Sequence, residues 1–581
     1  MSRVSVWFIH SLIICSFYAC TLSSAGSLQK NDPAGSANIR LNQLGFYPQG
    51  PKIAIVLDSL GGAFYLKSSE SQEVKFEGTL GEEKYWEFSG ENVRQADFST
   101  FKEPGAYYLE TASGEKSYPF SISPDLNLEL HKASLKSYYF QRASLALDKT
   151  YAGDWERDAG HIDEQIKVHA SAASSARPEG SIISAPKGWY DAGDYGKYTA
   201  NAAYTSWIMF HLYEQFPAQL SQWEYAIPES GNKSPDLLDE ALWSLEWLLK
   251  MQDPSNGMVY HKLTGLKHPP KVMPHEDQAE RFVIGKSTGS NFAYAAFMAQ
   301  AGRILAGIDR HKDLSQSCIE AARKAWQWGL EHPKVFFQNS PDVHTGQYKD
   351  GNAEDERLWA AVELFISTGD KSYLDYLQGY AKFWNKAPGW NSTGVLAWMS
   401  INLHRDKFPE RVAKTAKERT QNLAEAYAKV VDQHPYHILL GRDKYDIIWG
   451  SNGIAASAGM CMIHAYLQEK DKRYLDAATE IMDYLAGRNA TGYCFITGFG
   501  SKSPKDIHHR PSAADGVEEP IPGFLVGGPQ GEKNYDGCNY PSEYPAAFYT
   551  DHWCSYSTNE VCLNWNAPLV YLSAGLEILY Q

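Results

Sequence analysis

The sequence lacks the features that mark several classes of protein. It has 8 cysteines in 581 residues and no pair of them spaced as CxxC, which excludes a zinc ribbon. It has no local basic patch, and 54 Lys and Arg against 69 Asp and Glu give a net charge of −15, so a nucleic-acid partner is not expected. Hydrophobic residues at 43% and charged residues at 21% are close to the globular average, which argues against a multi-pass membrane protein and against extensive disorder.

Aromatic residues, by contrast, are plentiful. They make up 13% of the chain and include 17 Trp and 36 Tyr. Flat aromatic faces over a cleft are surfaces on which sugar rings stack. A large core rich in tyrosine explains the same composition, so composition alone leaves both interpretations open.

Residues 1–25 are predicted to be a signal for export. A short basic start is followed by a largely apolar stretch over 4–19, which Ser and His interrupt and which is too short for a membrane anchor. Residues 16–20 resemble a bacterial lipobox, which would leave Cys20 as the site of a lipid anchor, whereas 23–26 offer an ordinary cleavage site. We therefore expect export to the bacterial periplasm, to the outer-membrane surface or out of the cell.

An exported chain can carry disulfides. We predict that Cys538 pairs with Cys554. The cysteines that follow the predicted signal are Cys318, Cys461, Cys494, Cys538, Cys554 and Cys562.

The remaining sequence divides into a β-rich part and a helical part. Between 37 and 125, short apolar runs such as 52–58 alternate with Pro-Gly and Ser-Gly turns, which is typical of a small β-sandwich. From 129 to 581 the hydrophobic period is helical; Ser234, for example, is predicted to be the N-cap of a helix with Pro235 at its first position. The connecting loops are long, which favours a helical toroid over a bundle, and long loops are where a functional site is expected.

One loop, 188–198, is a candidate for chemistry. Asp191 and Asp194 are separated by Ala-Gly and flanked by aromatic residues, so a tight turn can point both carboxylates at one water or cation. The structural alternative is an Asx-turn or a helix N-cap, both of which are common for Asp.

Two segments near the C-terminus add further candidates. Glu560 stands among Tyr, Trp and apolar residues in 549–569, and such surroundings raise the pKa of a carboxyl group and suit a general acid. A solvated Glu at a helix start is the alternative. The His-His-Arg sequence at 508–510 clusters donors that can hold hydroxyls or orient a carboxylate, whereas adjacent histidines seldom face one metal ion.

Together, these segments resemble glycoside hydrolase family 9, whose members include many cellulases, and within it the subgroup with an N-terminal immunoglobulin-like domain. The family's Asp-Ala-Gly-Asp turn stands at 191–194, and its Asn-Glu motif at 559–560. Its His-x-Arg motif stands at 508–510, preceded by Thr-Gly-Phe-Gly at 497–500. The likeness runs from about residue 39 to 581, and it implies a mainly α fold, an (α/α)6 barrel preceded by a small immunoglobulin-like β-sandwich.

The resemblance also implies roles for single residues. Asp194 is expected to be the general base that activates water, Asp191 to help hold that water, and Glu560 to be the general acid. The family inverts the anomeric configuration, which requires the two carboxyl groups to stand ~6.5–9.5 Å apart with a water between them. The residues expected to bind substrate are His508 and Arg510 through hydroxyls, and Trp189, Tyr190, Tyr195 and Tyr556 by stacking, although each of these aromatic residues is equally typical of a core.

The implied chemistry requires no cofactor, but calcium is common in the family. Asp355 and Glu356 are the nearest match to calcium ligands, and an exposed acidic helix start explains them as well.

Two departures from the family pattern involve cysteine. Some relatives hold a structural zinc with two Cys and two His; His161 and His169 are kept, but Ala143 and Gly160 stand where the cysteines are expected, so zinc is not expected.

Conversely, Cys494 and Cys562 stand where the family usually has a small Ser, Thr or Ala. They either pack as small apolar residues or pair with each other near the active site.

The predicted function is that of an inverting glycoside hydrolase that cleaves β-1,4-glucosidic bonds within cellulose-like, mixed-linkage or decorated glucans, acting as a monomer. An exo-acting β-glucosidase or exo-β-glucosaminidase of the same family is the first alternative; it requires that loop 262–276 or loop 541–553 close the non-reducing end of the cleft. A carbohydrate-binding protein without catalysis is a more distant alternative, because binding alone requires no acid and base.

Overall fold

The structure, a computed structural model, describes residues 37–57, 61–377, 386–441, 446–532 and 536–581. The predicted export signal and Cys20 lie outside these residues. Within the described ranges, no helix combines the length and the hydrophobicity needed to cross a membrane.

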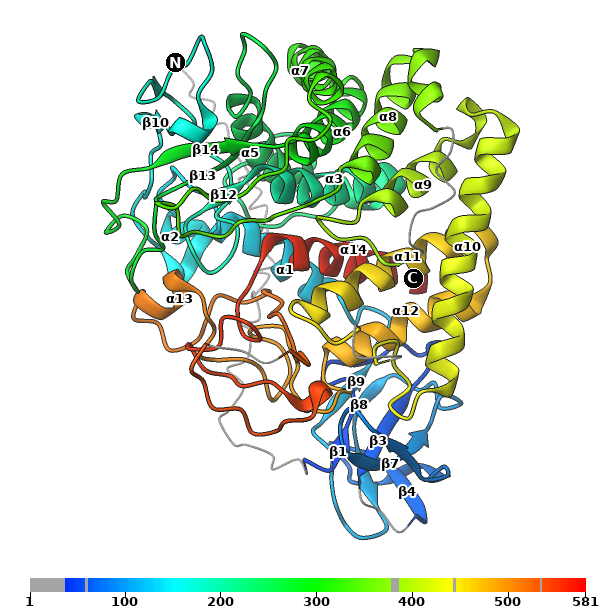
Figure 1. Ribbon diagram of the computed structural model, residues 1–581. Helices are drawn as coiled ribbons and strands as arrows, with labels where there is room; N and C mark the ends of the chain where they lie inside the picture. The colour runs from blue at the N-terminus through cyan, green and yellow to red at the C-terminus, as the bar shows by residue number, and fades with distance from the viewer. Residues whose placement is uncertain (1–36, 58–60, 378–385, 442–445, 533–535) are drawn as a thin grey trace, which may run out of the picture. The chain divides into compact units, whose positions relative to one another are not determined.

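The N-terminal part, drawn in blue in Figure 1, is a sandwich of two β-sheets, as predicted. One sheet has the strand order β1-β3-β7-β6 and the other β2-β9-β8-β4-β5. The strands are β1 (Ile39–Arg40), β2 (Gly45–Phe46), β3 (Ile53–Leu57), β4 (Ala63–Ser68), β5 (Val74–Thr79), β6 (Lys84–Trp86), β7 (Glu91–Asp97), β8 (Gly105–Thr111) and β9 (Phe120–Ile122).

Strand β3 joins the sandwich to the helical part. All five of its residues, Ile-Ala-Ile-Val-Leu, are buried. Ala54 and Val56 belong to the core of the sandwich, whereas Ile53, Ile55 and Leu57 belong to the core that continues into the helices. Because successive side chains of a strand point to opposite faces, a strand buried on both faces is apolar throughout.

The helical part contains the helices α1 (Leu128–Phe140), α2 (Lys149–Ala152), α3 (Thr199–Gln215), α4 (Pro217–Leu220), α5 (Asp236–Lys250), α6 (Thr288–Leu305), α7 (Lys312–Glu331), α8 (Glu354–Thr368), α9 (Gly394–Leu403), α10 (Glu410–Gln433), α11 (Ser451–Glu469), α12 (Lys472–Leu485), α13 (Arg510–Ala514) and α14 (Leu563–Tyr580).

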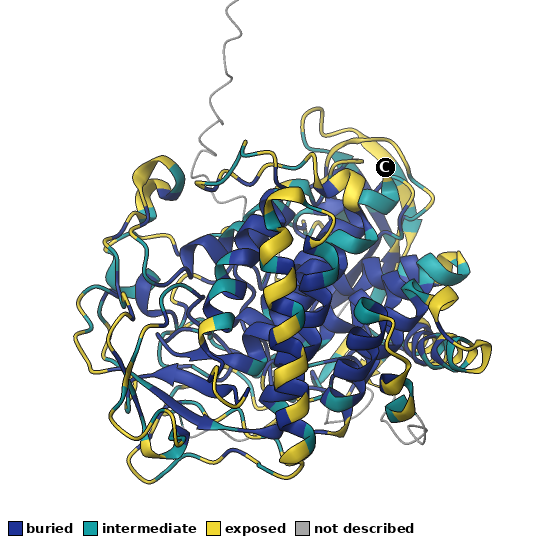
Figure 2. Cartoon of the chain, turned by 90° about the horizontal axis from the view of Figure 1, so that it is seen from above, coloured by how far each residue is buried: buried dark blue, intermediate teal, exposed yellow. Residues whose placement is uncertain are grey.

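Helices α3, α6, α8, α9, α11 and α14 form an inner layer. Most of their residues are small or apolar and are buried. Figure 2 shows buried helices, in dark blue, in the interior of the molecule. Helix α6 packs on α3 and α8, α8 packs on α9, and α14 packs on α11 and α3. The outer helices α1, α5, α7, α10 and α12 each pack on an inner one, and α7 and α10 bury a single face, as amphipathic helices do. The two layers confirm the predicted helical barrel.

A third sheet lies between the barrel helices in sequence and supports the predicted catalytic loop. Its order is β11-β10-β14-β13-β12, with β10 (Ile166–Val168), β11 (Ile182–Ile183), β12 (Lys197–Tyr198), β13 (Tyr260–Thr264) and β14 (Phe282–Lys286). Strand β12 directly follows the loop with Asp191 and Asp194 and leads into α3.

One helix start differs from its prediction. Helix α5 begins at Asp236, with Pro235 in the cap position, and no side chain caps it. Ser234 therefore does not act as the N-cap, because the extended backbone at Pro235 separates it from the first turn.

A buried cluster of charges stands where the sandwich meets the barrel. Arg488, at 0% exposure, forms ion pairs with Asp483 at 3.1 Å and with Glu480, and its Nη1 also donates to the carbonyl of Ile53 in β3. Asn42 of the sandwich donates to Asp483 at 2.8 Å. The buried carboxylates are thus compensated by one guanidinium and by groups of both parts.

We expect Arg488→Met to destabilise the protein by about 3–5 kcal/mol, because it leaves buried carboxylates without their cation. The apparent Tm, measured at a fixed scan rate, should fall sharply. Arg473→Met, which breaks the exposed pairs with Asp471 and Glu425, is the matched control and should change Tm little. Equal Tm losses for both variants would contradict the assigned role of Arg488.

Candidate active site

The three predicted motifs meet through backbone hydrogen bonds. The N–H of Leu563 donates to the carbonyl of Asp191 at 2.9 Å, and the N–H of Arg510 donates to the carbonyl of Gly193 at 3.0 Å. The N–H of His508 donates to the carbonyl of Asn559 at 3.0 Å. Segments that lie far apart in the sequence therefore form one wall of the site.

Gly193 is required at this contact. A Cβ atom at that position would lie 1.9 Å from the carbonyl oxygen of His508 and 3.2 Å from Oε1 of Glu560. The turn therefore tolerates no side chain between its two aspartates, which explains the Ala-Gly spacer in physical terms.

The motifs line a cavity of about 610 Å³. Its lining includes Asp191, Asp194, His508, Arg510, Tyr556 and Glu560, which are the predicted catalytic residues and three of the predicted substrate-binding residues. It also includes aromatic residues that sequence analysis did not single out: Tyr198, Tyr348, Trp390, Trp449 and Trp565.

Asp191 is held by neutral donors. Asn201 Nδ2 donates to one carboxylate oxygen at 2.6 Å and the Tyr348 hydroxyl donates to the other at 2.5 Å. Burial raises the pKa of Asp191 to about 7, although these two hydrogen bonds oppose the shift.

Asp194 has different surroundings and a different pKa. Its Oδ1 accepts from the N–H of Gly196 at 3.1 Å, so the Asx-turn considered as a structural alternative is present, while Oδ2 lies 2.7 Å from Nδ1 of His268. Burial would raise the pKa of Asp194, but the hydrogen bond and charge of His268, with Arg510 and the Gly196 N–H, outweigh it and lower the pKa to about 2.

Glu560 forms no ion pair with any of the described residues. Burial raises its pKa well above the usual range, and the charge of Asp194 adds to the rise, whereas Arg510 and the N–H of Gly193 oppose it. The site therefore contains one carboxyl group whose ionised form is favoured and one whose protonated form is favoured, which is the pairing needed for general acid–base chemistry.

His508 and Arg510 lie beside these carboxylates. His508 Nδ1 is 2.7 Å from the carbonyl of Trp553, and Arg510 donates to the carbonyls of Gly193 and Pro269, each at 2.9 Å. Both side chains reach the cavity from ordered hydrogen-bond networks.

Trp189, Tyr190 and Tyr195 do not stack against a ligand, contrary to the expectation for these aromatic residues. They are 1%, 0% and 1% exposed and do not line the cavity. Trp189 Nε1 donates to Glu240, and the Tyr195 hydroxyl donates to the carbonyl of Val272. Their rings fill the core behind the loop, because the backbone turn that directs the aspartates outward directs these neighbours inward.

Sequence analysis missed His268, Asn201 and Tyr348. His268 belongs to loop 262–276, which was considered only as a structure that closes the cleft. Asn201 stands in the first turn of α3, 10 residues after Asp191 in the sequence, and this closeness in sequence could have indicated the contact. Nothing local marks Tyr348, because only the tertiary fold brings it to Asp191.

The predicted disulfide is present: Cys538 and Cys554 are bonded, with their Cα atoms 5.7 Å apart. Cys494 and Cys562 are free and buried, so they pack singly and do not pair. Cys562 Sγ lies 3.8 Å from Asp191 and 3.4 Å from the Tyr348 hydroxyl, at the edge of the cavity.

Asp355 and Glu356 are buried, at 6% and 2% exposure, at the start of α8, which excludes the exposed acidic helix start considered above. Oε2 of Glu356 has no hydrogen-bond partner among the described residues. Burial raises the pKa of Glu356 well above its usual range, and repulsion from Asp355 and Asp350 adds to it.

The histidines that match the zinc site of some relatives have other partners. His161 contacts the Tyr190 hydroxyl and Asp277, and His169 contacts Ser171 and Asp342.

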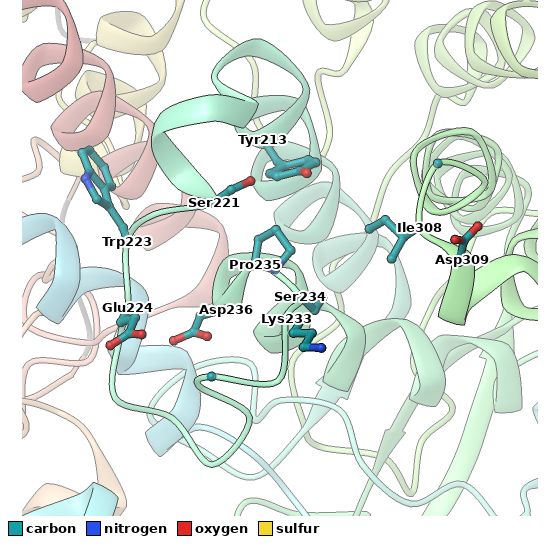
Figure 3. A pocket seen from close by; sticks show the side chains of 12 residues that line it. Tyr213, Ser221, Trp223, Glu224, Lys233, Ser234, Pro235, Asp236, Ile308 and Asp309 are labelled. Carbon is teal, nitrogen blue, oxygen red and sulfur yellow. The ribbon is translucent and has the colours of Figure 1, made fainter.

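A second cavity, of about 540 Å³, lies near the C-terminal end of α3 (Figure 3). Tyr213, Trp223 and Pro235 line it together with acidic groups. Its buried carboxylate, Asp236, accepts hydrogen bonds from the Tyr225 N–H and the Ser230 hydroxyl and thus stabilises a turn. None of the predicted motif residues reaches this cavity, so the 610 Å³ cavity is the candidate active site.

A helical barrel in which two carboxyl groups with oppositely shifted pKa values face one aromatic-lined cavity is the arrangement expected of a glycoside hydrolase. The family model described as glycosyl hydrolase family 9 matches residues 128–573, and the model of the cellulase N-terminal ig-like domain matches residues 34–116. The chain belongs to glycosyl hydrolase family 9 and carries its cellulase-type catalytic domain.

The chain is similar to several characterised proteins. It is 40% identical over 573 residues to the xyloglucan-specific endo-beta-1,4-glucanase BoGH9A of Bacteroides ovatus, covering 97% of this chain and 96% of that protein. It is 30% identical to endoglucanase D of Acetivibrio thermocellus, covering 96% and 85%. Among solved structures, Bacteroides ovatus GH9 superposes with a TM-score of 0.88 at 39% identity, covering 94% of this chain and 99% of that one.

We expect His268→Ala to move the acid limb of the kcat/KM profile to higher pH. A donor to a carboxylate lowers its pKa, so removal of His268 raises the pKa of Asp194. His275→Ala on the same loop is the control, because His275 lines a different cavity. An acid limb that stays in place in His268→Ala would contradict this role.

Proposed function

We propose that the protein is an inverting endo-β-1,4-glucanase that acts on decorated β-glucans, with xyloglucan as the first substrate to test. The observation that carries the proposal is the pair Asp194 and Glu560, which line one cavity with pKa values shifted in opposite directions. Such a pair is what a general base and a general acid need at one pH.

In the proposed reaction, protonated Glu560 donates its proton to the glycosidic oxygen as the bond to the anomeric carbon breaks. Ionised Asp194 takes a proton from the attacking water as the new bond to the anomeric carbon forms. Each carboxyl group ends in the opposite protonation state, and proton exchange with solvent restores both. Asp191 is proposed to hold the same water, since Asn201 and Tyr348 orient its carboxylate.

Substrate binding is assigned to the polar and aromatic residues of the cavity. His508 and Arg510 are proposed to bind sugar hydroxyls near the scissile bond. Trp449, which is 46% exposed, and Tyr556, whose ring lies 5.6 Å from that of Trp449, form an accessible aromatic surface suited to stacking.

Endo action is favoured by the surroundings of the cavity. His268 is the only residue of loop 262–276 that lines the cavity, and no residue of loop 541–553 lines it. Tyr544, near the start of the second loop, instead packs against Gly90 of the sandwich. These loops thus do not supply the wall that an exo-acting enzyme needs.

The decorated substrate is proposed from the similarity to the xyloglucan-specific enzyme of Bacteroides ovatus. A polymeric substrate is met outside the cytoplasm, which agrees with the predicted export and with the Cys538–Cys554 disulfide.

The test is to follow products from xyloglucan, cellohexaose and mixed-linkage glucan during the first minutes of reaction, with NMR detection of the new anomeric configuration. We expect internal cleavage with inversion, and a loss of about 10²–10⁴-fold in kcat for both Asp194→Asn and Glu560→Gln. Monosaccharide as the sole early product would indicate the exo-acting alternative. Binding without cleavage of any glucan would indicate a carbohydrate-binding protein.

We also propose a structural calcium ion at Asp355 and Glu356. The unpartnered oxygen of buried Glu356 and the nearby carboxylates of Asp355 and Asp350 fit a hard cation that prefers oxygen ligands. The ion would neutralise these carboxylates and take no part in the proposed proton transfers.

Calcium should therefore stabilise chelator-treated protein by about 2.7 kcal/mol when its concentration is 100 times the Kd. The Tm should rise accordingly. Glu356→Gln should abolish the response. Glu354→Gln, an exposed change in the same helical turn, should keep it. No calcium-dependent Tm in the unaltered protein would refute the site.

A further inference from the structure

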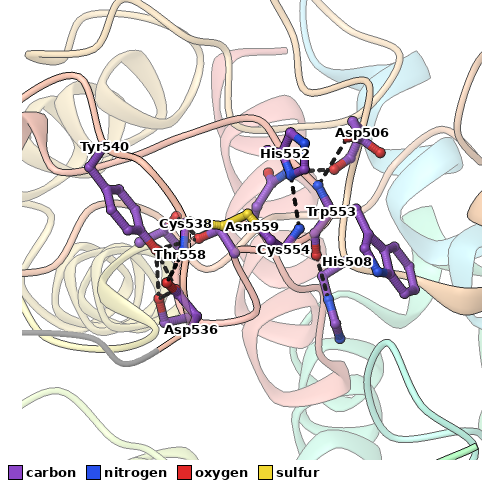
Figure 4. Close-up of a disulfide and its surroundings, with 12 residues drawn as sticks. Asp506, His508, Asp536, Cys538, Tyr540, His552, Trp553, Cys554, Thr558 and Asn559 are labelled. Atoms are coloured by element: carbon purple, nitrogen blue, oxygen red, sulfur yellow. Dashed lines mark hydrogen bonds between the residues drawn. A yellow bond between two sulfur atoms is a disulfide. The ribbon is translucent and has the colours of Figure 1, made fainter. Parts of the chain in front are cut away.

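The loop formed by residues 536–557, which precedes Glu560, is cross-linked close to the active site (Figure 4). The Cys538–Cys554 disulfide joins its two arms. Asp536 accepts hydrogen bonds from the hydroxyls of Tyr540 and Ser557, the latter at 3.0 Å, which ties the start of the loop to its end. The backbone of Trp553, next to Cys554, is therefore anchored from more than one side.

Trp553 contacts His508 in two ways. Its carbonyl oxygen lies 2.7 Å from His508 Nδ1, and its indole ring stacks on the imidazole with the ring centroids 4.4 Å apart and an interplanar angle of 24°. The backbone N–H of Trp553 donates to the carboxylate of Asp506 at 3.0 Å. Lys271 Nζ lies 4.8 Å from the centroid of the same indole.

These contacts determine which nitrogen of His508 can accept a hydrogen bond. A carbonyl oxygen only accepts, so Nδ1 carries a proton. Burial lowers the pKa of His508, although the hydrogen bond to Trp553 opposes the shift, so the ring is neutral near pH 7 and Nε2 is its acceptor. Since the ring lines the cavity, this acceptor is available to a sugar hydroxyl.

Stacking on the Trp553 indole completes the orientation of the His508 ring. The χ2 torsion of histidine is broad, so a single hydrogen bond leaves the plane of the ring loosely defined. A parallel indole restricts that plane, and the disulfide restricts the backbone that carries both contacts.

We propose that Trp553, anchored by the Cys538–Cys554 disulfide, is a positioning residue that sets the tautomer and the ring plane of His508 for substrate binding. Trp553 does not itself line the cavity, so it acts through His508. This inference rests on the proposed glucanase function.

The test is a double-mutant cycle on xyloglucan or cellohexaose, whichever the enzyme cleaves, with kcat and KM measured separately. Trp553→Ala should lower kcat/KM by about 2- to 12-fold, which corresponds to the energy of one aromatic pair, and Trp553→Phe should restore most of it. In a His508→Ala background, Trp553→Ala should have no further effect, because the residue that it positions is absent. The Tm of every variant is measured alongside.

The outcomes separate the proposals. If the losses of Trp553→Ala and His508→Ala multiply in the double variant, Trp553 acts independently of His508 and the inference is wrong. If the unaltered enzyme cleaves no glucan, the proposed function fails instead.

The disulfide is tested by a Cys538→Ser/Cys554→Ser variant and by dithiothreitol on the folded protein, with free thiols counted by mass spectrometry. We expect the variant to have lower kcat/KM than the unaltered enzyme and to be insensitive to dithiothreitol, and we expect no loss from either treatment in the His508→Ala background. An unchanged kcat/KM in the double-serine variant would refute the anchoring role.

Discussion

The contact between the backbones of 191–193, 508–510 and 559–563 is the constraint on which the active site depends. These segments exchange hydrogen bonds of 2.9–3.0 Å, and Gly193 lies so close to His508 that no side chain fits between them. Because the acid and the base stand on different segments of this contact, their separation follows from backbone pairing and not from flexible side chains. Any change that separates the segments also separates Asp194 from Glu560.

Burial is common to the three carboxyl groups of the site, but their partners differ. Asp194 faces His268 and Arg510, so its charged form is favoured, whereas the donors to Asp191 are the neutral side chains of Asn201, Tyr348 and Cys562. Burial raises the pKa of Glu560 well above its usual range, and the charge of Asp194 adds to the rise. One buried environment thus suits both a base and an acid, because burial favours the neutral form of a carboxyl group unless cationic partners and hydrogen bonds outweigh it, as they do at Asp194.

The sandwich and the barrel are linked by both apolar and ionic contacts. Strand β3 contributes alternate residues to two cores, and Arg488 compensates buried carboxylates of the barrel while it contacts the carbonyl of Ile53. The sandwich therefore completes the core of the helical part.

Local sequence was informative where the physical cause is local. The continuous apolar run of β3, the helical periodicity beyond 129 and the Asp-Ala-Gly-Asp turn depend on neighbouring residues, and the sequence predicted each of them. The pairing of Cys538 with Cys554 was also predicted, across a short loop. The stacking roles of Trp189, Tyr190 and Tyr195 were wrong, because sequence spacing does not reveal which side of a turn faces the core.

The two-part architecture, the family and the acidic residues of the motifs could be predicted without a structure, because periodicity, turn chemistry and motif spacing are properties of short segments. The groups that set the pKa values of these acidic residues and orient their neighbours are brought together by the folded chain. His268, Tyr348 and Trp553 reach Asp194, Asp191 and His508 across large sequence separations. Their effects depend on distances of about 3 Å and on exclusion of water, and no single segment of the chain contains that information.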